Sequence, residues 1–427
     1  MLSDPRSHGL WELTAPAAPA AQQLVGNHTV DVAVVGGGFT GSSAALHLAE
    51  AGKQVAVIEA VEVGFGGAGR NVGLVNAGMW VMPEVLLKTL RSPYGDRLLD
   101  LLGTAPKLVF DIVRRHDIAC EAMPVGTLHC AAGDAGLNEI KAREAQWQAR
   151  GADVEILDAS RAAALLGTRR YKGALLDRRA GTIQPLAYVR GLARAAQKAG
   201  ARIFTDSPVQ SIERKGDRWQ LRTAGGMIEA DWVILSMDAY GTGPGDRARQ
   251  EQVPLPYFNI ATRPLSPDMR TRILPEGQGA WDTQLVMTSF RMDQAGRLIY
   301  GSIGALRGTG LDVHRAWARR SLKKAFPGIG DVEFEAEWYG TIGMTSDNLP
   351  RFHKYAPQMI GFSGYNGRGI APGTTFGRVL ASYVTGEISD TELPLPVAPI
   401  EQASYRLMKH MFYELGSQAV HVLEHRI

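Results

Sequence analysis

The sequence predicts a mixed α/β fold in which a Rossmann-like, dinucleotide-binding domain is interrupted by a second domain with an antiparallel sheet. The first sign is a strand, a helix and another strand within about 32 residues from Thr29, since such a crossover is almost always right-handed with parallel strands. The second sign is a strand-dominated stretch from Val253 to Gly340, broken by one helical segment around 312–326. A length of 427 residues also favours two domains.

The first predicted strand, "TVDVAVVGGG", begins at Thr29 and is a β-branched run typical of a strand buried on both faces. The next segment, "FTGSSAALHLAEAG", has helical spacing through Ala44, Leu48 and Ala51, and "KQVAVIEA" is the second strand. Residues 1–28 contain the Ala/Pro-rich stretch "LTAPAAPAAQQL", and we interpret them as an N-terminal leader.

A glycine motif marks the junction of the first strand and helix. Gly36, Gly38 and Gly41 form G-x-G-x-x-G, and Glu59 ends the second strand. In this motif the first glycine makes a tight turn, the second lets a pyrophosphate approach the backbone, and the third lets the helix pack on the sheet. The helix N-terminus favours the anion, and the acid accepts hydrogen bonds from ribose hydroxyls. The predicted contacts also include Phe39, Thr40 and Ala60.

A second glycine-rich loop, "GFGGAGRNVG" (64–73), follows Glu59 directly. NAD needs no such loop, whereas FAD must thread a ribityl chain and a flavin ring past bare backbone, so FAD is favoured. Arg70 is either a surface ion-pair residue or a positive charge near the flavin and substrate. "GTGPG" (241–245) has the wrong spacing for a second dinucleotide motif, which argues against an additional NAD(P)H site. The predicted FAD contacts in this loop are Gly66, Gly67, Ala68, Gly69, Arg70, Asn71, Val72 and Gly73.

Later segments supply the rest of both domains. Residues 185–200 predict a helix, and 201–237 predict a strand, a hairpin and another buried strand. Strand-like runs then include "YFNIATRPL", "LVMTSFRMD" and "RLIYGSIG". We expect a discontinuous FAD-binding domain of residues 29–85, 160–250 and 340–395, a substrate domain of 86–159 and 251–339, and a helical C-terminal tail of 396–427.

Composition narrows the function classes. The net charge of +3, from 46 basic and 43 acidic residues, gives no nucleic-acid footprint. Cys120 and Cys130 form no metal-binding or disulfide pattern, so no metal site is predicted and the chain is interpreted as cytoplasmic. No apolar run is long enough for a transmembrane span. The segment 73–87 and the C-terminal tail leave a peripheral association with the inner face of a membrane open.

The chain resembles the D-amino-acid oxidase superfamily of FAD oxidoreductases from about residue 29 to 390. The motifs "VVGGGFTGSSAALHLAEAG" and "GYNGRGIAPGTTFGRVLA" are the most specific, and "GFGGAGRNVG", "ATRPL" and "WYGTIGMTSDNLPRFH" also match. The resemblance implies an FAD-binding domain of the glutathione-reductase-2 type. Family members usually carry Ala-Ser where this chain has Gly67 and Ala68, so a hydroxyl contact with FAD is missing at that position.

"GFSGYNGRGIAPG" is a glycine turn that opens a helix, so its N–H groups can face an anion. The resemblance implies that this element faces the flavin N1–C2=O edge, where a positive end raises electron affinity. Arg368 either acts there or reaches solvent. The Cys and His residues that attach FAD covalently in some relatives are missing here, so we expect non-covalent FAD. The remaining predicted FAD contacts are Val209, Gly340, Gly367, Arg368, Gly369 and Ile370.

The resemblance implies oxidation of a C–N bond, in which a neutral amine gives a hydride to flavin N5 and the imine hydrolyses in water. Arg291, on a strand of the substrate domain, is the candidate partner of a substrate carboxylate, since Arg binds carboxylates in a bidentate manner. Tyr257 and Trp338 are either walls of the site or ordinary core aromatics, and His353 is expected to be satisfied in a loop. The predicted catalytic set is Arg291, Arg70, Arg368 and Tyr257.

The predicted substrate is L-pipecolate or a similar cyclic or N-substituted amino acid. γ-Glutamylputrescine or another polyamine conjugate is the alternative, and a non-catalytic flavin-binding protein is the alternative of another class. Oxygen or a membrane quinone is the expected electron acceptor. The sequence leaves open the chirality of the substrate and the oligomeric state.

Overall fold

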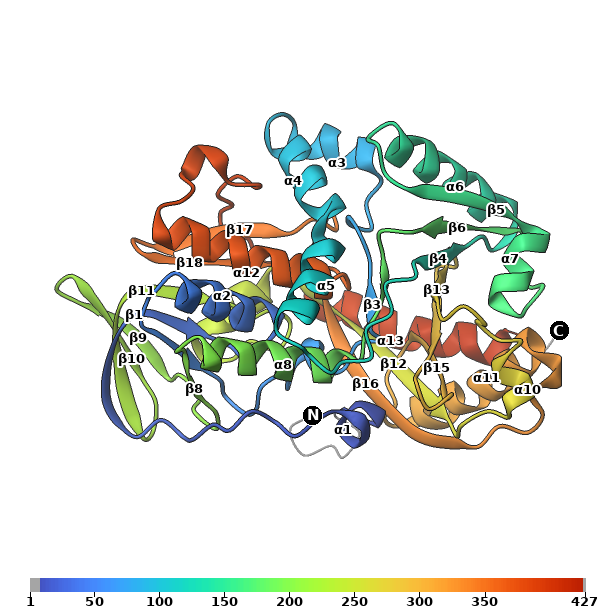
Figure 1. Cartoon of the computed structure of the whole chain (residues 1–427), viewed down its shortest axis with the longest axis horizontal. Helices are drawn as coiled ribbons and strands as arrows, with labels where there is room; N and C mark the ends of the chain where they lie inside the picture. The colour runs from blue at the N-terminus through green and yellow to red at the C-terminus, as the bar shows by residue number, and fades with distance from the viewer. Residues whose placement is uncertain (1–7, 425–427) are drawn as a thin grey trace.

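The computed structural model of the chain describes residues 8–424. Two eight-stranded sheets lie side by side, the first on the left of Figure 1 and the second on the right. The centre of the first sheet is five parallel strands in the order β8-β2-β1-β11-β18, with β17 antiparallel at one edge and the hairpin β9-β10 attached to β11. Its strands are β1 (Gly26–Val35), β2 (Val55–Ile58), β8 (Arg202–Phe204), β9 (Ser211–Lys215), β10 (Arg218–Arg222), β11 (Gly226–Leu235), β17 (Arg351–Ala356) and β18 (Met359–Ser363).

Strand β1 is buried on both faces, as predicted, and its side chains alternate between two cores. Val32 and Val34 pack with the helices of the largest core, whereas Ala33 and Val35 face the core beneath the β9-β10 hairpin. Helices α2 (Phe39–Glu50), α8 (Pro185–Lys198) and α12 (Ile370–Thr385) cover the first of these faces (Figure 1). The sheet therefore holds the start of α2 and the start of α12 close together.

The second sheet has the order β16-β12-β15-β14-β13-β4-β6-β5 and is antiparallel except for the parallel pair β4 and β13. Its strands are β4 (Thr127–Cys130), β5 (Val154–Asp158), β6 (Gly173–Asp177), β12 (Val253–Thr262), β13 (Gly279–Asp282), β14 (Thr288–Met292), β15 (Leu298–Ile303) and β16 (Phe334–Met344). Its helices are α6 (Gly133–Gln148), α7 (Ala159–Leu166), α10 (Pro267–Arg270), α11 (Thr309–Ala325) and α13 (Arg406–Leu423). The predicted fold class is confirmed.

The remaining elements connect the two halves. They are α1 (Leu10–Thr14), β3 (Leu74–Val75), β7 (Gly181–Thr182), α3 (Pro83–Leu90), α4 (Tyr94–Gly103), α5 (Ala105–Arg115) and α9 (Asp246–Gln250). Strands β3 and β7 pair as a separate two-stranded sheet. Helix α5 contacts α12 and so braces the helical layer of the first sheet.

Two expected boundaries differ from the structure. Residue 160 was expected to begin a segment of the FAD-binding domain, but β6 continues the second sheet to Asp177, because β6 pairs with both β4 and β5. The expected leader, within its described residues, is not a free spacer. Leu10 and Trp11 of α1 are fully buried, and the Trp11 ring packs edge-on against Trp338 at 5.2 Å. An Ala/Pro-rich composition gave no signal of this docking.

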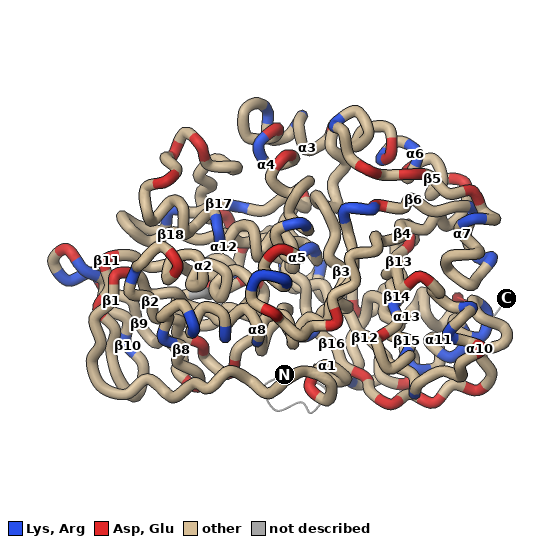
Figure 2. Tube along the Cα trace, viewed as in Figure 1, with Lys and Arg blue, Asp and Glu red and all other residues tan. Residues whose placement is uncertain are grey.

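Charged residues of both signs are interspersed along the whole trace (Figure 2), and their totals nearly balance, with a net charge of +3. Within residues 8–424, none of the helices combines the length and apolar character that crossing a bilayer would need.

Candidate active site

A cavity of about 1450 Å³ lies where the two sheets meet. The first sheet contributes Val35 and Ile58 at the ends of β1 and β2, and the second contributes Phe258 and Ser302 from β12 and β15. A single small-ligand pocket usually has about 300–1,000 Å³. The cavity therefore has room for a large cofactor together with a second molecule.

Most of the predicted cofactor contacts line this cavity. Gly38 is the N-cap of α2, and no side chain caps this helix or places an acid in its first turn. The first N–H groups of a helix have no partner within the helix and attract anions. The predicted cofactor contacts that line the cavity are Gly36, Gly38, Phe39, Thr40, Glu59, Ala60, Gly66, Gly67, Ala68, Asn71, Val72, Val209, Gly367, Arg368, Gly369 and Ile370.

Glu59 is fixed at the end of β2 by backbone donors. Its Oε2 accepts from Gly37 N–H at 2.6 Å and its Oε1 accepts from Val61 N–H at 3.1 Å. Burial raises the pKa of this carboxyl, while the hydrogen bond from Gly37 opposes that shift. An ionised carboxylate has about four acceptor positions, so acceptor positions remain for hydroxyl groups of a ligand.

The glycines fall into two groups with different physical roles. A Cβ at Gly38 would meet only Ala68 at 3.9 Å, and one at Gly369 would meet no atom within 4 Å. In contrast, a Cβ at Gly41 would lie 2.0 Å from the Gly36 carbonyl oxygen, and one at Gly73 would lie 2.1 Å from that of Ile183. The first group leaves space in the cavity, and the second allows close packing of the protein itself.

Helix α12 directs a second N-terminus at the cavity. Its N-cap, Gly369, makes no side-chain cap, and its first turn carries no acid. Gly369 and Ile370 line the same cavity as Gly38 and Phe39. Two positive helix ends thus face one space, and negative charge bound there would be stabilised by both.

Arg368 precedes α12 and is held between two indole rings. Its guanidinium carbon lies 5.0 Å from the ring centre of Trp80 and 4.8 Å from that of Trp281, and its Nη1 donates to the Ala77 carbonyl at 2.9 Å. Burial, reinforced by the charge of Arg143, lowers the pKa of Arg368 to about 9. It therefore remains positively charged at neutral pH and does not reach solvent.

Residues 31–383 match the DAO family, whose members are described as FAD dependent oxidoreductases. This chain belongs to that family. The predicted superfamily is confirmed, and with it the use of FAD and an oxidoreductase activity on amine or amino-acid substrates.

Several curated relatives cover most of the chain. The γ-glutamylputrescine oxidoreductase of Escherichia coli is 32% identical over 367 residues, which are 84% of this chain and 84% of that protein. The probable oxidoreductase OrdL of Rhizobium meliloti is 28% identical over 90% of this chain and 89% of its own length. The crystal structure of glycine oxidase from Geobacillus kaustophilus matches with a TM-score of 0.69 and 21% identity, over 88% of this chain and 99% of that chain, which shows a shared fold.

The residues that line the cavity fit FAD. Gly38 and Gly369 leave space in which the pyrophosphate and the flavin, respectively, would approach the backbone, and Glu59 would accept hydrogen bonds from ribose hydroxyls. Neither Cys120 nor Cys130 lines the cavity, and both thiols are buried. Non-covalent attachment remains a prediction, and these positions are compatible with it.

Arg291 does not take the role predicted for it. Its side chain is 1% exposed, donates to the Ile183 carbonyl and lies 3.8 Å from Glu121. Ser289, on the same face of β14, does line the cavity, but Arg291 lies two residues farther along the strand, beyond the edge of the cavity. A strand pattern gives the face of a residue and not the point at which a cavity ends, and Arg291 is not among the residues that line this cavity.

Arg70 is also outside the cavity and is not on the surface. It is buried, its Nε donates to the Phe65 carbonyl at 2.8 Å, and its guanidinium lies over the Phe65 ring at 4.6 Å. It therefore stabilises the second glycine loop from outside the cavity. Gly41, Gly69, Gly73 and Gly340 do not line the cavity either, since a Cβ at each would meet protein atoms at close range.

Of the predicted aromatic and histidine residues, one lines the cavity and two do not. Tyr257 lines the cavity, and its hydroxyl is buried with no hydrogen-bond partner among the described residues. Trp338 is a fully buried core residue that donates to the Arg70 carbonyl at 2.8 Å. His353 lies 2.8 Å from Glu251 and does not line the cavity.

The residues around Arg368 were not predicted from the sequence. Trp80 precedes α3, His129 is on β4, Arg143 is on α6 and Trp281 is on β13, and all four line the cavity. His129 stacks on Trp281 with ring centres 3.5 Å apart. These residues come from separate segments of the chain, so no local pattern in the sequence groups them.

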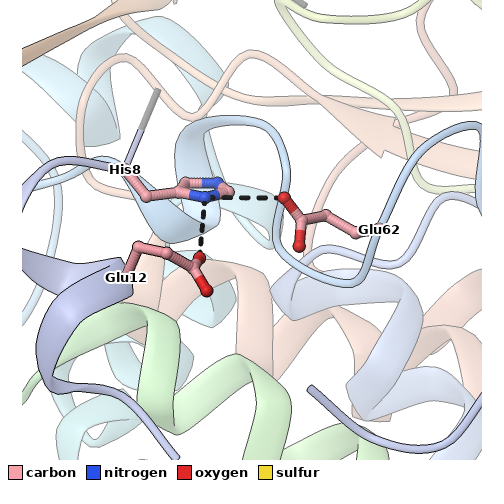
Figure 3. A group of neighbouring side chains, drawn as sticks. All are labelled: His8, Glu12 and Glu62. Atoms are coloured by element: carbon pink, nitrogen blue, oxygen red, sulfur yellow. Dashed lines mark ion pairs between the residues drawn. The ribbon is translucent and has the colours of Figure 1, made fainter. Parts of the chain in front are cut away.

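A further cluster, His8, Glu12 and Glu62, has the composition of a metal site (Figure 3). His8 Nδ1 lies 3.3 Å from Glu12 and 3.6 Å from Glu62. However, Arg190 Nη2 also reaches Glu12 at 2.8 Å and Glu62 at 3.3 Å. One guanidinium already pairs with both carboxylates, so the cluster is better explained as the ion-pair network that ties α1 to α8.

Proposed function

We propose that this FAD dependent oxidoreductase oxidises the C–N bond of an amine that also carries a carboxylate group. Bound FAD would supply the two-electron oxidation, by accepting a hydride from the carbon next to the nitrogen. The observation that carries the proposal is the pair of buried guanidinium groups, Arg368 and Arg143, at one cavity. The charged groups around these two side chains determine which charge on the substrate is favoured.

Both guanidinium groups keep an unused donor. The Nε of Arg368 and the Nε of Arg143 are buried and have no hydrogen-bond partner within the part of the chain that the structure describes. Arg143 uses its Nη2 to donate to the Trp80 carbonyl at 2.8 Å, and Glu139 approaches the same atom at 3.5 Å. A buried donor without a partner costs about 1–3 kcal/mol, and an anionic ligand would remove that cost.

The neighbouring histidine does not compensate the two charges. Burial lowers the pKa of His129 well below its usual value, and the charges of Arg143 and Arg368 lower it further. His129 is therefore neutral at neutral pH, so this part of the cavity is positive overall. A carboxylate is complementary to it, whereas a substrate that carries only ammonium groups is repelled.

For a substrate whose oxidised amine lies beside its carboxylate, as in L-pipecolate, the same positive charges also suit the chemistry at the nitrogen. Hydride loss requires a neutral amine, and nearby positive charges lower the pKa of a bound ammonium group. Tyr257 adds a phenol that burial keeps protonated, because its pKa is raised well above the usual value. We propose that its unpartnered hydroxyl orients the substrate, so that no separate catalytic base is required.

A polyamine conjugated to an amino acid fits these features best. The similarity to the γ-glutamylputrescine oxidoreductase of Escherichia coli extends over 84% of both chains. A γ-glutamyl conjugate offers a carboxylate at one end and an oxidisable amine at the other, and the cavity of about 1450 Å³ is lined by residues of both sheets. L-Pipecolate also carries a carboxylate and remains the second candidate.

Anaerobic mixing with candidate substrates tests the proposal through the visible absorbance of the flavin. We expect γ-glutamylputrescine to bleach the flavin and free putrescine, which lacks the carboxylate, to fail. Bleaching by L-pipecolate alone would exclude the conjugate, and bleaching by putrescine alone would exclude carboxylate recognition. If none of these amines bleaches the fully FAD-loaded enzyme, both proposed substrates are excluded.

The electron acceptor follows from re-oxidation of the bleached enzyme. We propose oxygen or a quinone, and rapid recovery of the visible absorbance in air with formation of hydrogen peroxide would identify an oxidase. Slow recovery in air with fast recovery on addition of a soluble quinone would identify a dehydrogenase. Only the second result would support the predicted peripheral association with a membrane.

A further inference from the structure

Helix α13 (Arg406–Leu423) has its polar side turned toward the protein. Arg406 Nε donates to the Gln252 carbonyl at 2.8 Å, and His410 Nδ1 lies 2.9 Å from that of Pro254. Farther along, Glu414 pairs with Arg307, and Ser417 and His421 are fully or nearly fully buried. The helix is therefore attached to α11 and β12 mainly by polar contacts.

The outward side of α13 is apolar, which reverses the usual arrangement of a surface helix. Phe412 is 72% exposed and Met408 is 68% exposed. The other large apolar residues exposed on or beside this helix are Tyr405, Leu407, Met411, Leu415, Val420 and Leu423. Single exposed apolar residues are ordinary, but a continuous helix face of them marks a contact surface.

The spacing on this face identifies the kind of partner. Tyr405, Met408, Phe412, Leu415, Ala419 and Val422 are separated by alternating steps of three and four residues. This is the seam of a coiled coil, in which apolar residues insert between those of a second helix. The inner face of α13 is not that seam, because its residues are polar.

The size of the face suits a stable protein interface. Each partner in such an interface contributes roughly 800 Å², and an aromatic side chain such as Phe412 offers on the order of 150–250 Å². Phe412 and six other exposed apolar side chains of α13, most of them more than half exposed, therefore supply a substantial part of that area. An 18-residue helix is about 27 Å long, which is sufficient for several layers of contacts.

Charge distinguishes a second helix from a lipid surface. Helices that lie on anionic membranes usually place several Lys or Arg residues beside the apolar face. Among the described residues of the outward face, Lys409 at its margin is the charged one; Arg406 is directed inward. A nearly neutral, apolar seam is therefore more suited to a protein partner with the same properties.

We propose that α13 pairs with α13 of a second copy of this chain across a two-fold axis. A two-fold interface uses one self-complementary patch twice, and this helix supplies such a patch. The pairing would lie next to the active site, because His421 of α13 approaches the hydroxyl of Ser302 at 3.2 Å and Ser302 lines the cavity.

Light scattering on the purified, FAD-loaded protein tests the pairing. We expect a mass of twice the 46.2 kDa of the chain for the unaltered protein, and a mass of one chain for a variant with both Phe412→Glu and Leu415→Glu. Val85→Glu, which changes an exposed apolar residue of α3, is the matched control and should remain a dimer. Unchanged flavin absorbance would show that the double variant is folded.

Disulfide trapping gives an independent measurement. Cys120 and Cys130 are buried, so a new surface cysteine dominates oxidation. Leu415→Cys should form a covalent dimer on mild oxidation, and Lys409→Cys, at the margin of the face, should not. A single-chain mass for the unaltered protein would overturn the proposal, as would a dimer insensitive to the double variant. Co-sedimentation of the single-chain protein with phosphatidylglycerol vesicles, abolished by Phe412→Glu, would assign the face to a membrane instead.

Discussion

Replacement of Gly38 by Ala should weaken FAD binding without weakening the protein itself. Gly38 has φ −83° and ψ −168°, which alanine adopts without strain. The added Cβ would meet Ala68 at 3.9 Å, an ordinary contact, and would otherwise point into the cavity. The stability of the cofactor-free protein should be unchanged or higher, because a glycine-to-alanine change at a compatible position contributes about 0.4–1 kcal/mol.

The affinity for FAD should change in the opposite direction and become weaker. A methyl group placed against the pyrophosphate overpacks the site, and overpacking costs about 1–3 kcal/mol. That range corresponds to a dissociation constant for FAD raised by about 5- to 150-fold. The stabilisation that a fixed concentration of FAD gives to the folded state should fall by the same about 1–3 kcal/mol.

Gly41→Ala is the matched comparison, because a Cβ there would lie 2.0 Å from the Gly36 carbonyl oxygen and 2.5 Å from Ser236 Oγ. Gly41→Ala should therefore destabilise the protein with and without FAD. Urea unfolding of both forms and titration of FAD fluorescence with cofactor-free protein distinguish the two variants. Unaltered FAD affinity in Gly38→Ala would refute the placement of the pyrophosphate at this turn.

Two further predictions concern the charged residues. Arg368→Gln should lower kcat/KM for a carboxylate substrate by about 10- to 150-fold, because a charge-assisted hydrogen bond contributes about 1.5–3 kcal/mol. The same variant should barely change kcat/KM for the carboxamide analogue. Arg291→Gln, outside the cavity, should not change the ratio of kcat/KM for the carboxylate substrate to kcat/KM for the carboxamide. Burial lowers the pKa of His314 from 6.5 to about 4, so below pH 6.5 the unfolded state binds a proton that the folded state does not. The free energy of unfolding should thus fall by up to about 3 kcal/mol between pH 6.5 and 4, and urea unfolding of His314→Asn should show a smaller fall; an identical pH dependence would contradict the assignment.

The cofactor half of the site was predictable because its determinants are local. The motif Gly36, Gly38 and Gly41 lies within six residues at a strand–helix junction, and Glu59 follows at the end of the adjacent strand. Backbone geometry then fixes the positions of all four, whatever the rest of the chain does. The same reasoning holds for Gly369 and Ile370, which open α12 and reach the cavity.

The substrate half could not be predicted in the same way. Arg143 and Arg368 are 225 positions apart in the chain, and only the pairing of β4 with β13 and the packing of α6 bring His129, Trp281 and Arg143 to one wall. Arg291 was chosen instead because it stands on a strand of the correct sheet. Sequence spacing gave its face correctly and left its distance from the cavity undetermined.

The contrast between the two arginines shows why burial alone does not identify a functional charge. Arg291 is as buried as Arg368, but its guanidinium meets the Ile183 carbonyl and the Glu121 carboxylate, so its charge is compensated by the protein. Arg368 is held by two indole faces and one carbonyl, with Nε left without a partner among the described residues and another cation, Arg143, near enough to lower its pKa. A protein gains nothing in stability from an uncompensated buried cation. An anionic ligand would supply the missing negative charge, and we propose that the carboxylate of the substrate is that ligand in this cavity.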